Sequence, residues 1–247
     1  MQNVRYVADE LKAQINSTKP LLITVLAGLL LLLVGLRVLP EESTPLMAKV
    51  MGLLCPTLAA AGVGAYVGRA LRGWLAVIGL LVLSIAGMFI IGALGASVIA
   101  IPLLLGWGFI NGMLLGPLVA FAIADAGAPV VIEALTGTTA VMMLAGLVVY
   151  ATGIDFSFLM PLLFLALMGL IVVGLVRIFV RFSRTVNLTY SILGMIVFAA
   201  YFLYDIFRVS RNENTWEAAV QMTMRLYLDF ANFFIYLLQY LLASRRR

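Results

Sequence analysis

Two aspartates lie inside strongly apolar segments, away from any polar loop. Asp205 occurs in AAYFLYDIFR, and Asp229 occurs in LYLDFANFFIYLLQYLL. An ionised carboxylate at the centre of a membrane-spanning helix costs about 2.5–3.5 kcal/mol on insertion scales, so such residues usually have both a partner and a function. The two segments are consecutive, and helices joined by a short turn lie side by side. We therefore expect Asp205 and Asp229 to be each other's partner.

Such a pair would respond to pH. Two carboxyl groups in contact in a poorly solvated site cannot both ionise, so they share a proton. The predicted depths of Asp205 and Asp229 complicate this interpretation, because a turn near residues 212–214 makes them differ by about 12 Å at a rise of 1.5 Å per residue. Contact therefore requires one helix to be tilted or staggered relative to the other.

The segment that contains Asp229 carries a polar stripe. Arg225, Asp229, Asn232, Tyr236 and Gln239 recur at spacings of 4, 3, 4 and 3, which puts them on one face of a helix. A polar face inside a membrane either lines a water-filled or ion-conducting path or forms hydrogen bonds to neighbouring helices. The stripe alone does not choose between these alternatives.

Composition defines the class of protein that positions these residues. The chain has 247 residues, of which 64% are hydrophobic and 11% charged, and its mean hydropathy is +1.14. These values indicate an integral membrane protein, and apolar segments of about 20 residues indicate helices rather than a barrel. A single cysteine and no histidine exclude a disulfide framework, a Ser/His protease and a His-ligated zinc site. The basic residues flank apolar segments, so we expect no nucleic-acid partner.

The apolar segments predict an all-α, polytopic membrane bundle of eight spans: 20–39, 47–68, 74–95, 99–124, 130–150, 158–177, 187–207 and 219–243. Residues 1–19 form a polar N-terminal segment, and residues 20–39 are expected to be an uncleaved membrane anchor. Gly106, Gly108, Gly112 and Gly116 are expected to give one helix a small-residue face for close packing, and the Ala/Gly stretch of 58–68 likewise.

Charge predicts the orientation. With eight spans, the side that holds the N-terminus carries 11 of the 16 basic residues: Arg5, Lys12, Lys19, Arg69, Arg72, Arg177, Arg181, Arg184 and Arg245 to Arg247. Basic residues concentrate on the cytoplasmic side. Both termini are therefore expected in the cytoplasm.

The sequence resembles the Bax inhibitor-1 family, also called the transmembrane Bax inhibitor motif family, in its bacterial branch. The resemblance covers residues 47–247 and rests on five stretches: MAKVMGLLCPTLAAAGVGAYVG, INGMLLGPLV, EALTGTTAVMMLAGLVVYATGIDFSFL, YFLYDIF and LYLDFANFF. It implies seven helices with the last in the centre, so the 20–39 span is additional. Where many relatives carry an acidic residue before LGP, this chain has Asn111, which we count among the pore-lining or interhelical polar residues.

The resemblance also implies a function. Some relatives are pH-sensitive calcium leaks, and their paired aspartates correspond to Asp205 and Asp229, which then act as sensor, gate and calcium ligands. The implied setting is the bacterial cytoplasmic membrane, with calcium as the transported ion and no other cofactor. The shared proton latches the last two helices, and its loss as the pH rises favours opening.

Two alternatives remain. Relatives are also linked to stress survival and to regulation of a membrane-bound AAA protease, which could grip residues 1–19 without any ion transport. An intramembrane aspartyl protease also needs two carboxylates on adjacent helices, and Tyr204-Asp205 matches its YD motif. Asp229, however, lies in YLDF rather than GxGD, and no PAL motif follows. We therefore expect no enzymatic activity.

Overall fold

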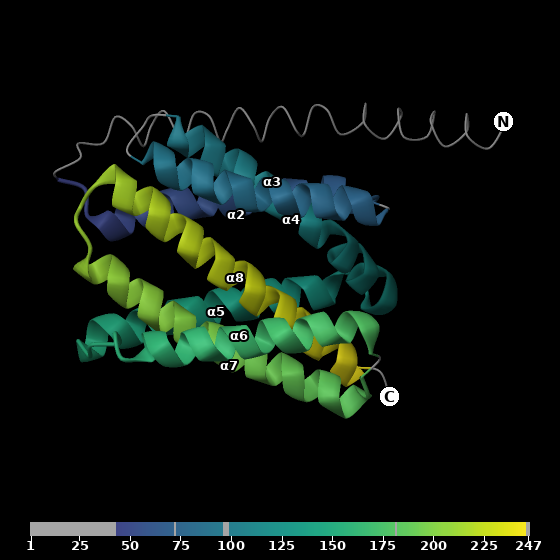
Figure 1. Ribbon diagram of the computed structural model, residues 1–247. Helices are drawn as coiled ribbons and strands as arrows, with labels where there is room; N and C mark the ends of the chain where they lie inside the picture. The colour runs from purple at the N-terminus through teal and green to yellow at the C-terminus, as the bar shows by residue number, and fades with distance from the viewer. Residues whose placement is uncertain (1–42, 72, 96–98, 181, 246–247) are drawn as a thin grey trace. The chain divides into compact units, whose positions relative to one another are not determined.

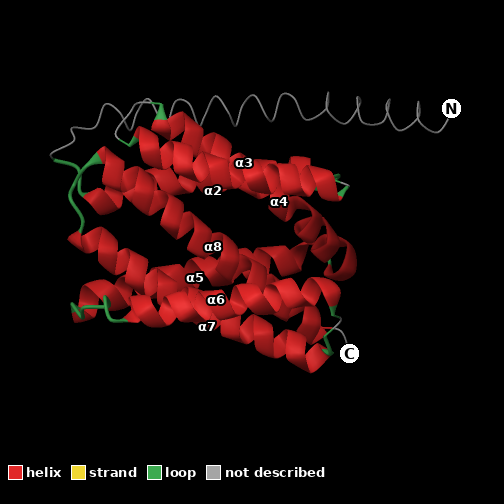
Figure 2. Cartoon of the chain, in the orientation of Figure 1, coloured by secondary structure: helices red, strands yellow, loops and turns green. Residues whose placement is uncertain are grey.

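The computed structural model describes residues 43–71, 73–95, 99–180 and 182–245. Figure 2 shows that this part of the chain is helical, with short loops and no strand. Its seven helices are α2 (Leu46–Gly68), α3 (Trp74–Leu94), α4 (Ala100–Ala126), α5 (Ala128–Thr152), α6 (Leu159–Phe179), α7 (Arg184–Arg211) and α8 (Trp216–Arg245). They confirm the seven spans predicted after residue 47. The predicted segments 1–19 and 20–39 lie outside the described residues.

The last two helices are longer than their apolar cores. α7 begins three residues before the predicted 187, because the side chain of Ser183 caps it by accepting a hydrogen bond from the backbone N–H of Val186 at 3.4 Å. It ends four residues after the predicted 207, and Arg208 and Arg211 lie in its last turn. Cations are favourable near the C-terminus of a helix, so polar residues extend it beyond the hydrocarbon.

The helices form two groups, with α8 between them. Figure 1 shows α2, α3 and α4 on one side, α5, α6 and α7 on the other, and α8 crossing obliquely from the first group to the second. α8 contacts α2, α4, α5 and α7. Half of its most apolar window is buried, the largest share among the described helices. The predicted central position of the last helix is confirmed.

The closest approach joins α2 and α4, the helix pair with the most extensive contact. A Cβ atom added to Gly108, Gly112 or Gly116 would collide with the backbone of α2. Gly64 faces the backbone of α4 at Phe109 in the same way. The predicted small-residue face is therefore correct for three of its four glycines. Gly106 was wrongly included, because its added Cβ would meet no atom within 4 Å.

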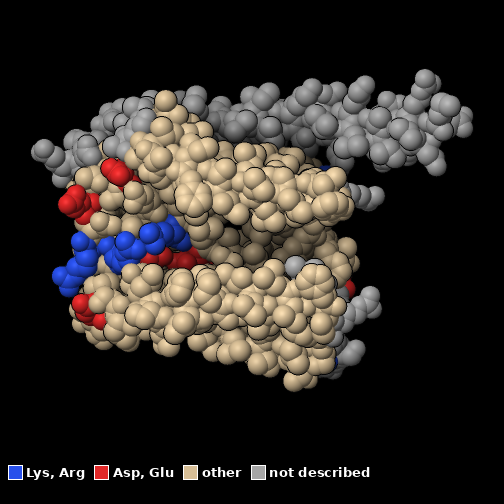
Figure 3. Space-filling view, in the orientation of Figure 1, with Lys and Arg blue, Asp and Glu red and all other residues tan. Residues whose placement is uncertain are grey.

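The outermost helices present apolar surface. In both α3 and α6 only 11% of the most apolar window is buried, and the side chains of Trp74, Phe89 and Leu165 are about 70% exposed (70%, 68% and 68%). Figure 3 shows charged side chains gathered toward one end of the visible face, while its remainder is almost free of them. Such a surface is stable in lipid, where outward apolar side chains cost nothing. The protein is an integral membrane protein.

Candidate functional site

α7 and α8 bring Asp205 and Asp229 together. Their side chains are within hydrogen-bonding reach of each other, and the two residues are only 4% and 5% exposed. Asp205 lies six residues before the end of α7 at Arg211, and Asp229 lies thirteen residues after the start of α8 at Trp216. At 1.5 Å per residue this leaves a difference of about 10 Å along the helices, which the oblique path of α8 compensates (Figure 1).

Each carboxyl keeps one oxygen without a partner. Asp205 Oδ1 and Asp229 Oδ2 are buried and form no hydrogen bond with any described residue. The rings of Phe202 and Phe233, one turn from each aspartate, pack with their centroids 5.9 Å apart. A buried polar atom without a partner is costly in such apolar surroundings. The site therefore favours a proton or a cation between the carboxyls.

Positive charges lie beside the pair. Arg225 is one turn before Asp229 on α8, and its charge acts on both carboxyls, while Arg208 of α7 also acts on Asp205. Neither arginine forms an ion pair with an acidic residue in the described part of the chain. Arg225 is exposed, and Figure 3 shows basic side chains in front of acidic atoms that lie between the two groups of helices. The charge of Arg225 therefore acts on a pair that is itself buried.

Two residues of the predicted stripe hold α8 to its neighbours. The hydroxyl of Tyr236 lies 3.0 Å from that of Tyr190 on α7, which donates a hydrogen bond to the carbonyl of Leu170 on α6 at 2.9 Å. Arg177 Nη1 of α6 donates to Gln239 Oε1 at 3.1 Å. These contacts favour the interhelical alternative for Tyr236 and Gln239.

The two asparagines do not join the pair. Asn232 Nδ2 donates to the carbonyl of Leu228 in its own helix at 2.8 Å. Asn111 belongs to a separate cluster between α3 and α4, where it accepts a hydrogen bond from Ser84 Oγ at 3.0 Å. In the same cluster Trp107 Nε1 donates to the carbonyl of Ser84 at 2.9 Å. The sequence predicted that Asn111 and Asn232 line a pore or form hydrogen bonds between helices. Asn111 bonds to a neighbouring helix, whereas the bond of Asn232 stays within its own helix.

Sequence reasoning missed Lys49. Its side chain is fully buried in α2, and its Nζ donates to the backbone oxygen and to Oδ1 of Asn214, both at 3.1 Å. The ammonium group also lies 5.4 Å from the ring centroid of Trp216. Lys49 therefore holds the connection between α7 and α8 against α2. Lys49 lies about one turn inside the predicted span 47–68, and this position could have indicated a buried cation. The sequence analysis had instead treated the basic residues as flanks of the apolar segments.

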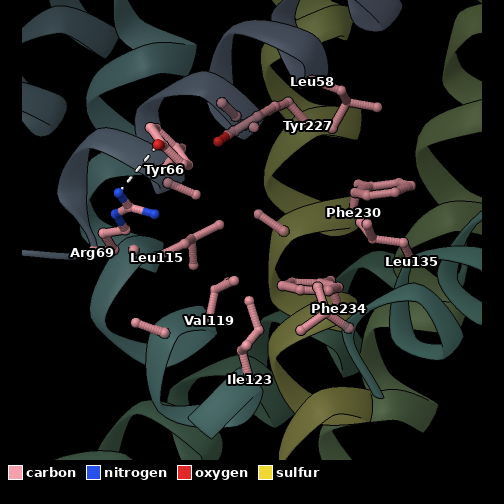
Figure 4. A pocket seen from close by; sticks show the side chains of 17 residues that line it. Leu58, Tyr66, Arg69, Leu115, Val119, Ile123, Leu135, Tyr227, Phe230 and Phe234 are labelled. Atoms are coloured by element: carbon pink, nitrogen blue, oxygen red, sulfur yellow. Dashed lines mark hydrogen bonds between the residues drawn. The ribbon is translucent and has the colours of Figure 1, made fainter. Parts of the chain in front are cut away.

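A large apolar cavity lies elsewhere. It has a volume of about 550 Å³, between α2, α4, α5 and α8, and neither aspartate lines it. Figure 4 shows Arg69 and Tyr66 on one wall and Tyr227, Phe230 and Phe234 on the opposite wall. Nearly all of its lining is apolar, apart from Arg69, whose Nη2 donates to the hydroxyl of Tyr66 at 3.1 Å. An apolar cavity of this kind is a poor path for a hydrated ion.

The two carboxyls are the candidate metal ligands of this site. The described residues contain no cluster of three or more His, Cys, Asp or Glu side chains that could hold a metal ion. Calcium usually takes six to eight oxygen ligands. Asp205 and Asp229 could supply only part of such a shell.

Comparison with known proteins gives the family. A protein of Campylobacter jejuni is 34% identical over 148 residues, which are 59% of this chain and 62% of the relative. Protein LIFEGUARD 4 of Arabidopsis thaliana is 37% identical over 145 residues, covering 52% and 56% of the two chains. The Golgi anti-apoptotic protein of Vaccinia virus is 36% identical over 118 residues, covering 48% and 49%. The chain thus spans about half to three-fifths of these relatives.

The family match extends further along the chain than these pairwise similarities. The family described as "Inhibitor of apoptosis-promoting Bax1" matches residues 43–247. This range contains all seven described helices and both aspartates. Because the match covers most of the sequence, the protein belongs to the Bax inhibitor-1 family of membrane proteins.

Proposed function

We propose that the protein is a pH-sensitive calcium leak of the bacterial cytoplasmic membrane, with Asp205 and Asp229 as sensor and gate. The observation that carries this proposal is the pair itself, which is two buried carboxyls within hydrogen-bonding reach, each with an unpartnered oxygen. The function needs no bond-making step and no resident cofactor. Both termini would lie in the cytoplasm, as the excess of basic residues on that side indicates.

The gate would work by repulsion. With one shared proton the carboxyls hold the C-terminal part of α7 to the middle of α8. When the proton leaves as the pH rises, the two carboxylates repel each other; unit charges about 4 Å apart repel by about 4 kcal/mol at an effective dielectric constant of 20. A bias of about 5.5 kcal/mol moves a two-state equilibrium from 1:99 to 99:1. Loss of one proton therefore biases the equilibrium towards separation of the helices at this point by an energy of this order.

The described conformation fits the closed state. The positive charges of Arg225 and Arg208 act on the pair, and they oppose the approach of a divalent cation. Tyr236 and Gln239 hydrogen-bond to α7 and α6 instead of facing a path. Opening would have to move α8 relative to α7 before calcium could reach the two carboxyls.

The test is calcium flux into liposomes that contain the purified protein, between about pH 6 and pH 8. Wild-type flux is expected to rise with pH. In Asp229→Asn the amide can donate to Asp205 at every pH, so the latch should stay closed and the pH dependence should flatten. Absence of flux above that of empty liposomes throughout the range, or an unchanged profile in Asp229→Asn, would refute the proposal.

Asp155→Asn is the matched control. Asp155 lies in the exposed connection between α5 and α6, outside the spans. Hydrogen bonds from the side chain and backbone N–H of Ser157 hold the pKa of Asp155 below its usual range. A carboxyl with a lowered pKa loses its charge only in more acidic solution, so it stays ionised throughout the assay. Its neutralisation should leave the pH profile unchanged.

A further inference from the structure

A second cavity, of about 470 Å³, lies at the end of the bundle where α6 ends and α7 begins. α4, α6, α7 and α8 all contribute to its wall. It differs from the larger cavity because two arginines, Arg177 of α6 and Arg184 of α7, line it and no acidic residue does. Neither arginine forms an ion pair with any described residue. The cavity therefore concentrates positive charge without internal neutralisation.

Both guanidinium groups are held in place by α8. Arg177 Nη1 donates to Gln239 Oε1 at 3.1 Å, and its guanidinium carbon lies 4.7 Å from the ring centroid of Tyr190. Arg184 donates through Nε to the carbonyl of Ala243 at 2.9 Å and through Nη2 to that of Ser244 at 3.0 Å. A guanidinium has five N–H donors. Arg177 uses one and Arg184 two, so most of their donors remain for a ligand.

The remainder of the wall suits a ligand with a polar and an apolar part. Asn187 and Ser191 of α7 provide an amide and a hydroxyl, whereas Leu118, Phe121 and Leu242 provide apolar surface. Arginine matches the geometry of phosphate oxygens and binds them with two donors at once. A phosphate beside apolar surface, at the end of a membrane-spanning bundle, is the chemistry of a phospholipid headgroup with its glycerol and first methylene groups.

We propose that this cavity is a binding site for the phosphodiester headgroup of an anionic membrane phospholipid. The lipid would bridge α6 and α7 through Arg177 and Arg184, which already contact α8 near its C-terminus. An occupant there holds three helices together and should stabilise the folded protein by mass action. This binding does not depend on ion conduction, so it can fail or succeed separately from the proposed leak.

The test is lipid retention by the full-length protein in native mass spectrometry, with phosphatidylglycerol compared with phosphatidylcholine. The wild type is expected to retain phosphatidylglycerol in preference and with saturation. Arg177→Gln and Arg184→Gln should each weaken its binding by about tenfold, because one hydrogen bond to a charged group contributes about one tenfold step in affinity. Thermal unfolding provides a second measurement, in which phosphatidylglycerol should raise the melting temperature of the wild type and not of these variants.

Arg69→Gln is the matched control. Arg69 follows the last residue of α2, is exposed, and forms no ion pair within the described residues, but it does not line this cavity. It should retain the lipid as the wild type does. Equal loss in Arg69→Gln would show only a general attraction of basic residues to anionic lipid and would overturn the proposal.

Two further outcomes decide between sources of the anion. If inorganic phosphate raises the melting temperature as much as phosphatidylglycerol does, the cavity is a site for free phosphate and the lipid assignment is wrong. If the wild type retains both lipids equally, the site is not selective for anionic headgroups and the proposal fails. The wild-type comparison is decisive even where a substitution prevents folding.

Discussion

Substitution of Gly112 by alanine tests the packing on which the bundle depends. Gly112 is buried in α4 and faces α2. An added Cβ would lie 2.6 Å from the Cα and carbonyl carbon of Ala61, and closer still to the carbonyl oxygen of that residue. Carbon atoms in favourable contact are about 3.5–4.0 Å apart. Because the obstacle is backbone, the two helices must separate by about 1 Å to accept one methyl group.

The magnitude follows from a comparison with Gly106 in the same helix. Insertion of a methyl group into a well-packed interface costs about 1–3 kcal/mol. Alanine also favours the helix over glycine by about 0.8–1 kcal/mol. Gly106→Ala gains only this second contribution, since no atom lies within 4 Å of its added Cβ. The propensity contribution cancels between the two variants, so Gly112→Ala should be less stable than Gly106→Ala by about 1–3 kcal/mol.

The assay is thermal unfolding of the wild type and both variants, purified in the same detergent. For a protein of this size 1 kcal/mol corresponds to about 2–4 °C. Gly112→Ala should therefore melt several degrees below Gly106→Ala, while Gly106→Ala should match or exceed the wild type. Equal melting temperatures for the two variants would refute the close approach of α2 and α4, and a lower value for Gly106→Ala would place the interface on the wrong face.

Three other substitutions or deletions test the remaining contacts. Lys49→Met keeps the buried volume but leaves both oxygens of Asn214 without this donor, so the free energy of unfolding should fall by about 1–3 kcal/mol in a denaturation curve. An unchanged curve would show that Lys49 does not stabilise the α7–α8 connection. Tyr236→Phe deletes only the contact with the Tyr190 hydroxyl, and a loss of about 0.5–1.5 kcal/mol is expected in the same measurement. Deletion of residues 1–19 should leave pH-dependent calcium flux intact. If the wild type shows no flux, and an AAA protease co-purifies only when residues 1–19 are present, the results would favour regulation of that protease instead.

The helices after residue 47 could be predicted from composition alone. A bilayer requires about 20 apolar residues per span, and each such run after residue 47 forms one helix. The ends were less predictable, because Ser183 and Arg208 extend α7 through capping and helix-end electrostatics outside the hydrocarbon. The small-residue face was predicted with one error, Gly106, which lies two residues before Gly108 and therefore points to another side of the helix.

The site was predictable in part. Asp205 and Asp229 could be identified because acidic residues inside apolar spans are costly. Their contact could only be conditional, since it depends on the tilt of α8 across the bundle (Figure 1). The partners of Tyr236 and Gln239 come from α7 and α6, at separations of 46 and 62 residues. No local pattern encodes a pairing over such a distance.

The sequence by itself determined that the protein spans a membrane as a helical bundle and that two carboxyl groups lie in apolar segments, where water does not solvate their charged form. The bilayer imposes both results on any chain of this composition, residue by residue. Only the tertiary structure decided that the carboxyls meet, that Arg225 of α8 also acts on Asp205 of α7 and that Lys49 holds the connection between their helices. These facts depend on the angle at which α8 crosses its neighbours, and that angle results from the packing of every contacting side chain together.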